Sequence, residues 1–133
     1  MLKSIKLSEH MSTDLVILDP EMDIRRAFHN LIKNNISGAP VVNAAGHLVG
    51  ILTERDCMRV VMHSEYHAMP GGPVSDFMTP DPKTVLSGDS ILNVAQAFIN
   101  GRFHRYPVTE DGRLVGIISR RDVMHALGKH FRL

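Results

Sequence analysis

The chain has 133 residues, of which 44% are hydrophobic and 22% charged, and its formal net charge is +1. This composition excludes a largely disordered chain, and the near-balance of charge gives no reason to expect nucleic acid or an anionic membrane as a partner. No apolar run reaches the roughly 20 residues of a membrane span, and the first residues form no secretory signal. With Cys57 as the single cysteine, we expect a cytoplasmic globular protein without internal disulfides.

Two copies of one segment fill the chain. Residues 48–51 (LVGI) recur unchanged as residues 114–117, at a spacing of 66. Upstream the spacing becomes 67, as between Pro40 and Pro107, and a turn can absorb this one-residue difference. Since internal repeats decide the architecture, they also predict the domains. The expected organisation is repeat one over 7–63, a linker over 64–73 and repeat two over 74–130.

Each copy opens with a short apolar run of strand length, over 14–18 in the first copy and 83–86 in the second. A helix follows in each copy, because apolar residues recur at positions i, i+3, i+4, i+7 and i+8 over 24–32 and over 91–99. We expect all five positions to form one buried stripe. The expected caps are Asp23 and Asp89-Ser90 at the helix starts, and Asn34-Asn35 and Gly101 at the ends.

Two strands and a second helix complete each copy. The expected strands span 39–42 and 47–52 in one copy and 106–109 and 113–118 in the other, and tight turns join them. The last helices follow Thr53 and Ser119, and their expected apolar faces carry Val60, Val61, Met124 and Leu127. Each copy therefore has the order β-α-β-β-α, which predicts an α/β (α+β) fold. Because about 60 residues bury little core alone, we expect the two copies to pack sheet to sheet.

A motif of the form Gly-x-x-Thr/Ser-x-x-Asp lies where the last strand meets the last helix. It places Thr53 and Asp56 in the first copy, and Ser119 and Asp122 in the second. These residue types form a capping box, in which each side chain accepts from the other's backbone N–H. A helix start is also an anion site, and an adjacent Asp can accept hydrogen bonds from a ribose diol. The residues leave both functions open. Arginines that could reach a phosphate are Arg55, Arg120 and Arg121.

The duplicated unit, which reads GAPVV…GHLVGILTERD in the first copy and RYPVT…GRLVGIISRRD in the second, resembles a stand-alone tandem cystathionine-beta-synthase (CBS) domain pair, or Bateman module. The resemblance implies two repeats packed with pseudo-twofold symmetry. It implies a non-catalytic regulatory or sensor module that binds an adenosyl ligand, such as AMP, ADP, ATP or S-adenosylmethionine, in the cleft between the repeats. It also implies a homodimer. The alternative is a ligand-free oligomerisation or adaptor module that regulates a separate partner protein.

The resemblance also implies site residues. In the family the motif Asp binds ribose hydroxyls, and the motif Thr or Ser lies near the ribose or phosphate. Asp122 and Ser119 hold these positions in one cleft, and Asp56 and Thr53 hold them in the other. The adenine-facing wall of the Asp122 cleft would be Met11, Val16, Ile36 and Ser37, and that of the Asp56 cleft would be Met78, Lys83, Phe103 and His104.

The two clefts differ in their cations. His104-Arg105, before the proline strand, resembles the phosphate-directed pair in the regulatory subunit of the AMP-activated kinase, whereas the first copy has Ser37-Gly38 at this place. We therefore expect the phosphorylated ligand at the Asp122 cleft, with Arg105, Arg120 and Arg121 nearby. The Asp56 cleft, with Lys83 and Arg55 as its cations, is expected to be weaker or empty.

Two further features suggest little chemistry. His63 and His67 have the spacing of a metal-binding pair on a helix, but Glu65 is the one evident third ligand, and we expect no metal there. Cys57 has no histidine partner that the sequence reveals, so we do not expect it to be a nucleophile. The prediction is a protein with no catalytic residues and no required cofactor.

Overall fold

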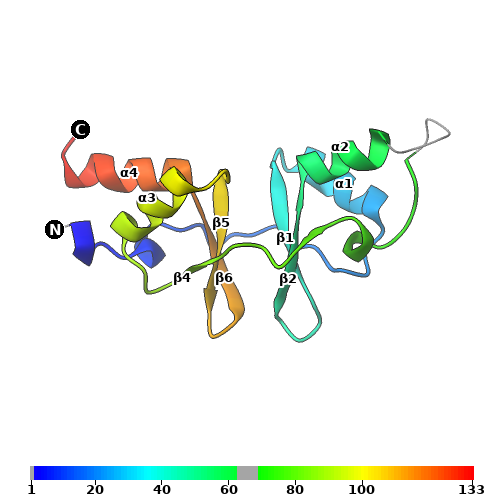
Figure 1. Cartoon of the computed structure of the whole chain (residues 1–133), viewed down its shortest axis with the longest axis horizontal. Helices are drawn as coiled ribbons and strands as arrows, with labels where there is room; N and C mark the ends of the chain where they lie inside the picture. The colour runs from blue at the N-terminus through cyan, green and yellow to red at the C-terminus, as the bar shows by residue number, and fades with distance from the viewer. Residues whose placement is uncertain (1, 63–68) are drawn as a thin grey trace. The chain divides into compact units, whose positions relative to one another are not determined.

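The structure is a computed structural model that describes residues 2–62 and 69–133. The chain forms two compact units, a central unit of Val16–Pro82 and a terminal unit of Met1–Leu15 with Lys83–Leu133. Each unit has a three-stranded sheet, two α-helices beside it and a hydrophobic core of its own (Figure 1). This confirms the mixed α/β class. The domain boundaries expected from the sequence copies, 7–63 and 74–130, stay a prediction.

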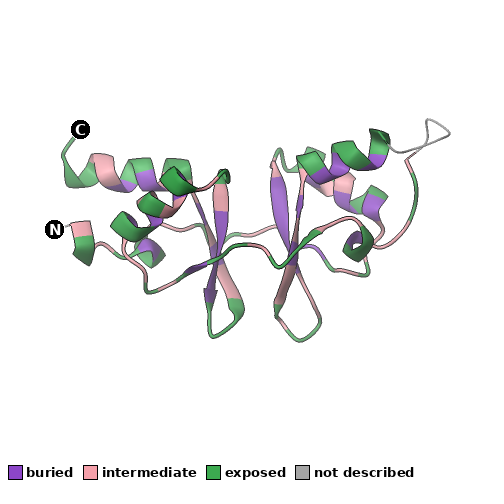
Figure 2. Cartoon of the chain, viewed as in Figure 1, coloured by how far each residue is buried: buried purple, intermediate pink, exposed green. Residues whose placement is uncertain are grey.

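The central unit is built mainly from the first copy. Helix α1 (Ile24–Lys33) precedes the antiparallel pair β1 (Gly38–Val42) and β2 (Leu48–Thr53), and α2 (Glu54–Met62) follows β2 directly. A short 3-10 helix (Val74–Asp76) then leads to β3 (Thr79–Pro80), which pairs antiparallel with β2. The buried side chains of α1, β1 and β2 form the core of this unit (Figure 2).

The terminal unit repeats this plan with the second copy. Strand β4 (Val85–Leu86) pairs parallel with β5 (Arg105–Glu110), which pairs antiparallel with β6 (Arg113–Ser119). Helices α3 (Ile91–Asn100) and α4 (Arg120–His130) lie beside this sheet. The start of the chain joins this unit through two 3-10 helices (Leu2–Ser4 and Leu7–Glu9) and a bridge in which Ser12 N donates to the Ile117 carbonyl at 2.8 Å.

Each copy therefore contributes its leading segment to the unit that the other copy mainly builds. Leu7, from the first copy, is fully buried in the terminal core. The leading segments cross their sheets so closely that a Cβ at Gly50 would overlap Met78 Sδ, and one at Gly116 would overlap Met11 Sδ. Both motif glycines are therefore close-approach positions, and both methionines pack against the core of their own unit.

The strand expected over 14–18 is wrong in extent. Only Leu18 pairs, in an isolated parallel bridge to Val41, and over 83–86 only Val85–Leu86 pairs. The reason is topological, because the chain leaves one unit and enters the other between Leu15 and Val16 and again between Pro82 and Lys83. In the described structure residues 15–17 and 82–84 pair with no strand, so apolar sequence alone does not place them in a ladder.

The first helix of each copy is confirmed, together with its caps. The Asp23 side chain accepts from Arg25 N at 2.8 Å, and Ser90 Oγ accepts from Asn93 N at 3.2 Å. The Arg25 guanidinium also donates back to the Asp23 carboxylate, and this hydrogen bond lowers the pKa of Asp23. The helices end as expected, at Asn34 and Gly101.

The apolar faces of the helices are less buried than expected. Ile32 and Ile99, the last members of the two stripes, are 66% and 77% exposed. At 3.6 residues per turn, position i+8 lies about 80° around the helix from position i, which turns it away from the sheet. On the last helices Val61 and Met124 are also exposed, whereas Val60 is buried. The expectation that all these residues are buried is wrong.

The turn of the β5–β6 hairpin is confirmed. Asp111 and Gly112 have φ values of 52° and 79°, as a two-residue turn of this type requires. In the β1–β2 turn Gly46 has a φ of 86°, and the Asn43 side chain accepts from two backbone N–H groups. The longer turn of the first copy thus accounts for the one-residue change in spacing.

Candidate functional site

In the terminal unit, the motif residues meet where β6 ends and α4 begins. Ser119 N donates to Asp122 Oδ2 at 2.9 Å, and Asp122 N donates to Ser119 Oγ at 3.1 Å. The capping box that the sequence left open is therefore present. It uses one carboxylate oxygen only. Asp122 is partly exposed, and within the described residues its Oδ1 accepts no hydrogen bond.

A cation lies beside this helix start. Arg105 begins β5 and faces Ser119 across the β5–β6 pair, so the two side chains leave the same face of the sheet. Arg105 Nε is buried, and it has no hydrogen-bond partner among residues 2–62 and 69–133. A buried donor without an acceptor is costly, so an added acceptor at this nitrogen would be favourable.

The segment before β5 is fastened to the same helix start. Arg120 N donates to the His104 carbonyl at 3.1 Å, and Arg120 Nε donates to the Phe103 carbonyl at 3.2 Å. His104, Arg120 and Arg121 are all exposed. The terminal unit thus brings together, around the first turn of α4, six of the predicted site residues: Asp122, Ser119, Arg105, His104, Arg120 and Arg121.

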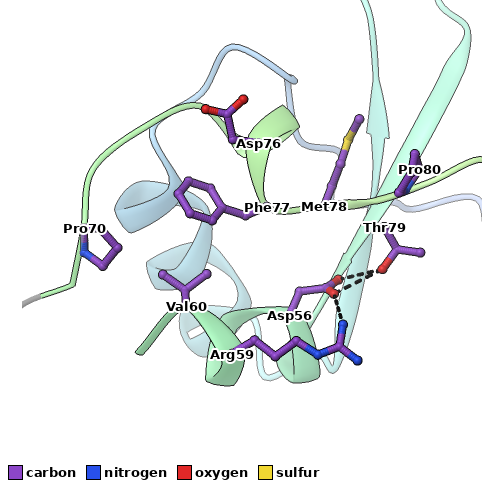
Figure 3. Close-up of a pocket in the computed structure, with 9 residues that line it drawn as sticks. All are labelled: Asp56, Arg59, Val60, Pro70, Asp76, Phe77, Met78, Thr79 and Pro80. Carbon is purple, nitrogen blue, oxygen red and sulfur yellow. Dashed lines mark hydrogen bonds and ion pairs between the residues drawn. The ribbon is translucent and has the colours of Figure 1, made fainter. Parts of the chain in front are cut away.

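In the central unit the motif Asp has more partners within the protein. Asp56 is 4% exposed and accepts from both Thr53 N at 2.9 Å and Thr53 Oγ1 at 3.0 Å. Thr79 Oγ1 donates to it from β3 at 3.1 Å, and Arg59 Nη1 lies 3.6 Å from Asp56 Oδ1 (Figure 3). The sequence did not single out Thr79 or Arg59. The sequence holds one indication of a role for Thr79, because Thr79 aligns with Ser12 and each follows directly after the methionine that recurs in the two copies.

Asp56 also borders a hollow of about 570 Å³ within the central unit. Figure 3 shows Phe77, Met78 and the segment around Pro70 on one side, and α2 with Val60 and Arg59 on the other. Most of this lining is apolar. The polar residues of the lining are Asp56, Asp76, Arg59 and Thr79.

The remaining predicted residues belong to different units. Val16, Ile36 and Ser37 lie in the central unit, and all three are partly exposed. The Ser37 carbonyl accepts from Glu54 N at 2.8 Å, which places it at the start of α2, beside the Thr53 motif. Lys83 is exposed and lies in the terminal unit. Each expected cleft draws on both units, and its assembly stays a prediction.

Cys57 follows Asp56 on α2 and is 3% exposed. Burial, followed by the charge of the neighbouring Asp56, raises the pKa of the Cys57 thiol to about 11. The thiol is therefore protonated at neutral pH, and a protonated thiol is a poor nucleophile.

The part of the chain that the structure describes offers neither of two other kinds of site. No cluster of three or more His, Cys, Asp or Glu side chains suited to a metal ion occurs within it. The histidine pair His63 and His67, with Glu65, lies outside the described residues. None of the helices described has the length and apolarity to cross a membrane.

Known proteins share sequence and structure with this chain. The family model of the CBS domain matches residues 4–63 and 74–129. The uncharacterized protein MJ1225 of Methanocaldococcus jannaschii is 32% identical over 120 residues, which cover 90% of this chain and 42% of that protein. An uncharacterized 17.7 kDa protein of Acidianus ambivalens is 28% identical over 123 residues, 92% of this chain and 73% of its own length. The chain thus spans under half of one relative and about three quarters of the other.

Solved structures share the fold. The structure of CBSX2, a CBS-pair protein from Arabidopsis thaliana, in complex with AMP has a TM-score of 0.85 at 25% identity, covering 97% of this chain and 100% of that one. The CBS domain pair of MJ0100, in complex with 5′-methylthioadenosine and S-adenosyl-L-methionine, has a TM-score of 0.79 at 25% identity, covering 94% and 97%. Both sequence copies are matched, and the fold is that of solved pairs. The chain therefore belongs to the CBS domain family and carries two copies of the domain.

Proposed function

We propose that the chain is a non-catalytic regulatory module that binds an adenosyl ligand, with Asp122 as the anchor for its ribose. The observation that carries the proposal is a pair of groups at one helix start that have no partner in the part of the chain that the structure describes, one an acceptor that solvent can reach and the other a buried donor. Within the described residues, Asp122 Oδ1 accepts no hydrogen bond, and the buried Arg105 Nε donates none. One ligand that brings both donors and acceptors would satisfy the two groups together.

The chemistry of a nucleotide fits these groups. The vicinal hydroxyls of a ribose are donors, and a carboxylate oxygen with its lone pairs unused can accept from them. A phosphate oxygen is an acceptor that an arginine Nε–H and the positive end of α4 both favour. Arg121, exposed in the first turn of α4, adds a second cation. The side chains therefore favour AMP, ADP or ATP over a ligand without phosphate.

The related structures support the ligand class. CBSX2 is seen with AMP, and MJ0100 with 5′-methylthioadenosine and S-adenosyl-L-methionine, so all three ligands contain an adenosyl group. A segment similar to this chain also occurs in the inosine-5′-monophosphate dehydrogenase of Aquifex aeolicus, where the match is 30% identical and covers 24% of that enzyme. We propose that the module acts on another polypeptide or on its own assembly. To do so it must bind the ligand with different affinity in two arrangements.

A calorimetric panel tests the proposal. AMP, ADP, ATP, S-adenosylmethionine, NAD and adenosine are each titrated into the protein, and melting temperatures are measured with the same ligands. We expect a phosphorylated adenosyl ligand to bind most tightly and to raise the melting temperature, because a ligand at 100 times its Kd stabilises the folded state by about 2.7 kcal/mol. Absence of binding and of any melting shift across the whole panel would exclude the function.

A second observation favours self-association. Exposed apolar side chains recur at equivalent positions of the two copies, with Ile32 and Ile99 on the first helices, and Met58 (58% exposed) and Met124 (65%) on the last. Single exposed apolar residues scattered at random would not fall at equivalent positions of the two repeats. An interface with a second molecule of the chain would require apolar residues at such repeated positions. We therefore propose a homodimer formed through these helices.

Sedimentation velocity tests the dimer with the double variant Met58→Glu and Met124→Glu, for which we expect a monomer. Leu86→Glu is the matched control, since Leu86 is 59% exposed but lies on β4. A wild-type monomer at all concentrations would exclude the dimer. A dimer that binds no adenosyl ligand would instead favour the alternative, an adaptor that regulates a separate partner protein.

A further inference from the structure

Asp56 has used its hydrogen-bonding capacity within the protein. It is 4% exposed, and its two oxygens accept from the Thr53 backbone N–H, the Thr53 hydroxyl and the Thr79 hydroxyl. The Arg59 guanidinium, 3.6 Å away, balances its charge. A carboxylate has about four lone-pair positions. Three hydrogen bonds and an ion pair take up these positions, and Figure 3 shows the carboxylate of Asp56 turned toward Thr79 and Arg59.

The equivalent carboxylate in the terminal unit lacks these partners. Ser12 stands at the position of Thr79, and it makes no hydrogen bond to Asp122 among the described residues. His125 stands at the position of Arg59, is exposed, and makes no ion pair with Asp122 in the described structure. The two copies therefore keep the same motif Asp and the same capping box, but only one Asp is saturated.

The hydrogen bond to Thr79 joins two parts of the sequence. Thr79 lies on β3, which belongs to the second copy, whereas Asp56 lies on α2 of the first copy. Strand β3 pairs with β2 over two residues only, and one of them, Pro80, has no N–H to donate. The side-chain bond therefore supplements a weak ladder and holds β3 against the start of α2.

We propose that Asp56 is a structural latch that fastens β3 to α2, and that the chain therefore binds one adenosyl ligand per polypeptide, at Asp122. A ribose at Asp56 would have to displace the Thr79 hydroxyl and open the attachment of β3. The hollow beside Asp56 offers space, but within the described residues both oxygens of Asp56 already accept hydrogen bonds. The number of ligands rests on the proposed function, whereas the latch itself does not.

The latch is tested without ligand by thermal unfolding of Thr79→Val and Ser12→Ala. We expect Thr79→Val to lower the melting temperature by about 5 °C, because a hydrogen bond to a buried carboxylate is lost. Ser12→Ala is expected to change it by about 1 °C or less, and Thr79→Ser, which keeps the hydroxyl, should stay close to the wild type. Equal melting temperatures for Thr79→Val and the wild type would overturn the latch.

The number of sites is tested by titrating AMP into the wild type and Thr79→Val. We expect one equivalent per chain in the wild type, and the Kd of the Asp122 site should stay within about twofold in Thr79→Val. Two equivalents in the wild type, with the second lost in Asp56→Asn, would overturn the inference. If no adenosyl ligand binds the wild type, the proposed function fails, and the melting temperatures of the ligand-free variants still decide the latch.

Discussion

The substitution Asp122→Asn separates the ligand function of this residue from its capping function. The asparagine carbonyl can still accept from Ser119 N, as Asp122 Oδ2 does at 2.9 Å, so the helix start keeps its hydrogen bond. The other carboxylate oxygen, which accepts no hydrogen bond from residues 2–62 or 69–133, becomes an NH2 group. That group is a donor and cannot accept from ribose hydroxyls. The variant therefore loses the ribose contacts while keeping the fold.

The expected size of the effect follows from those contacts. Two hydrogen bonds from a ribose diol to a charged acceptor contribute about 3 kcal/mol in total, at about 1.5 kcal/mol each. Since 1.4 kcal/mol corresponds to a tenfold change, the Kd for AMP should rise about a hundredfold. Isothermal titration calorimetry measures this change directly, and the melting temperature without ligand should stay near that of the wild type.

Asp111→Asn is the matched control, because it removes the same charge from the same unit. Asp111 lies in the β5–β6 turn, at the opposite end of the hairpin from Ser119, and asparagine tolerates its φ of 52°. We expect its Kd for AMP to equal that of the wild type. If Asp122→Asn changes the Kd less than threefold while the wild type binds AMP, the assignment of Asp122 as the ribose anchor is refuted.

Three further predictions concern stability. Gly50→Ala should lower the free energy of unfolding in urea by about 1 to 3 kcal/mol, because its Cβ would overlap Met78 Sδ. Gly88→Ala is the control and should be neutral, because there is open space around Gly88. Equal losses in the two variants would contradict the close approach at Gly50. Leu7→Ala should cost about 2 to 5 kcal/mol in the same assay, since Leu7 is fully buried, and a loss below about 1 kcal/mol would show that the N-terminal segment is not part of the terminal core. The raised pKa of Cys57 predicts that its contribution to the free energy of unfolding is fully present below pH 9. This contribution falls by roughly 2 to 3 kcal/mol as the pH rises to about 11, because the thiol of the unfolded chain loses its proton first. Cys57→Ala should remove this decrease.

Local patterns predicted most of the elements. The 3.6-residue period gave α1 and α3, and the capping residues Asp23 and Ser90 hold the helix starts as expected. The exchange of leading segments could not be predicted, because an apolar residue such as Leu7 carries no information about which of two similar cores it enters. The exposure of side chains at i+8, such as Ile32, does not follow from apolar spacing alone, because the spacing does not say how wide a face the helix buries against the sheet.

The capping geometry of the motif residues could be predicted from the sequence, but the further hydrogen-bond partners of the two motif carboxylates could not. Spacing placed Ser119 and Asp122 at one helix start and Thr53 and Asp56 at the other, and both capping arrangements form. The difference between the two carboxylates depends on Thr79, which is 23 positions from Asp56 in the sequence and reaches it only through β3. A contact of this kind depends on tertiary structure. The two motifs share their residue types, but their carboxylates have different hydrogen-bond partners.

The most direct measurement is a 1H–15N NMR titration of the wild-type protein with AMP that follows the side-chain Nε–H of Arg105 and the backbone amides of both helix starts. The account predicts that the Arg105 Nε–H and the amides of 119–122 shift together and saturate at one equivalent, while the amides of 53–56 stay nearly unchanged. Saturable shifts at 53–56, with Arg105 and 119–122 unaffected, would show that the nucleotide is held elsewhere and would contradict the assignment.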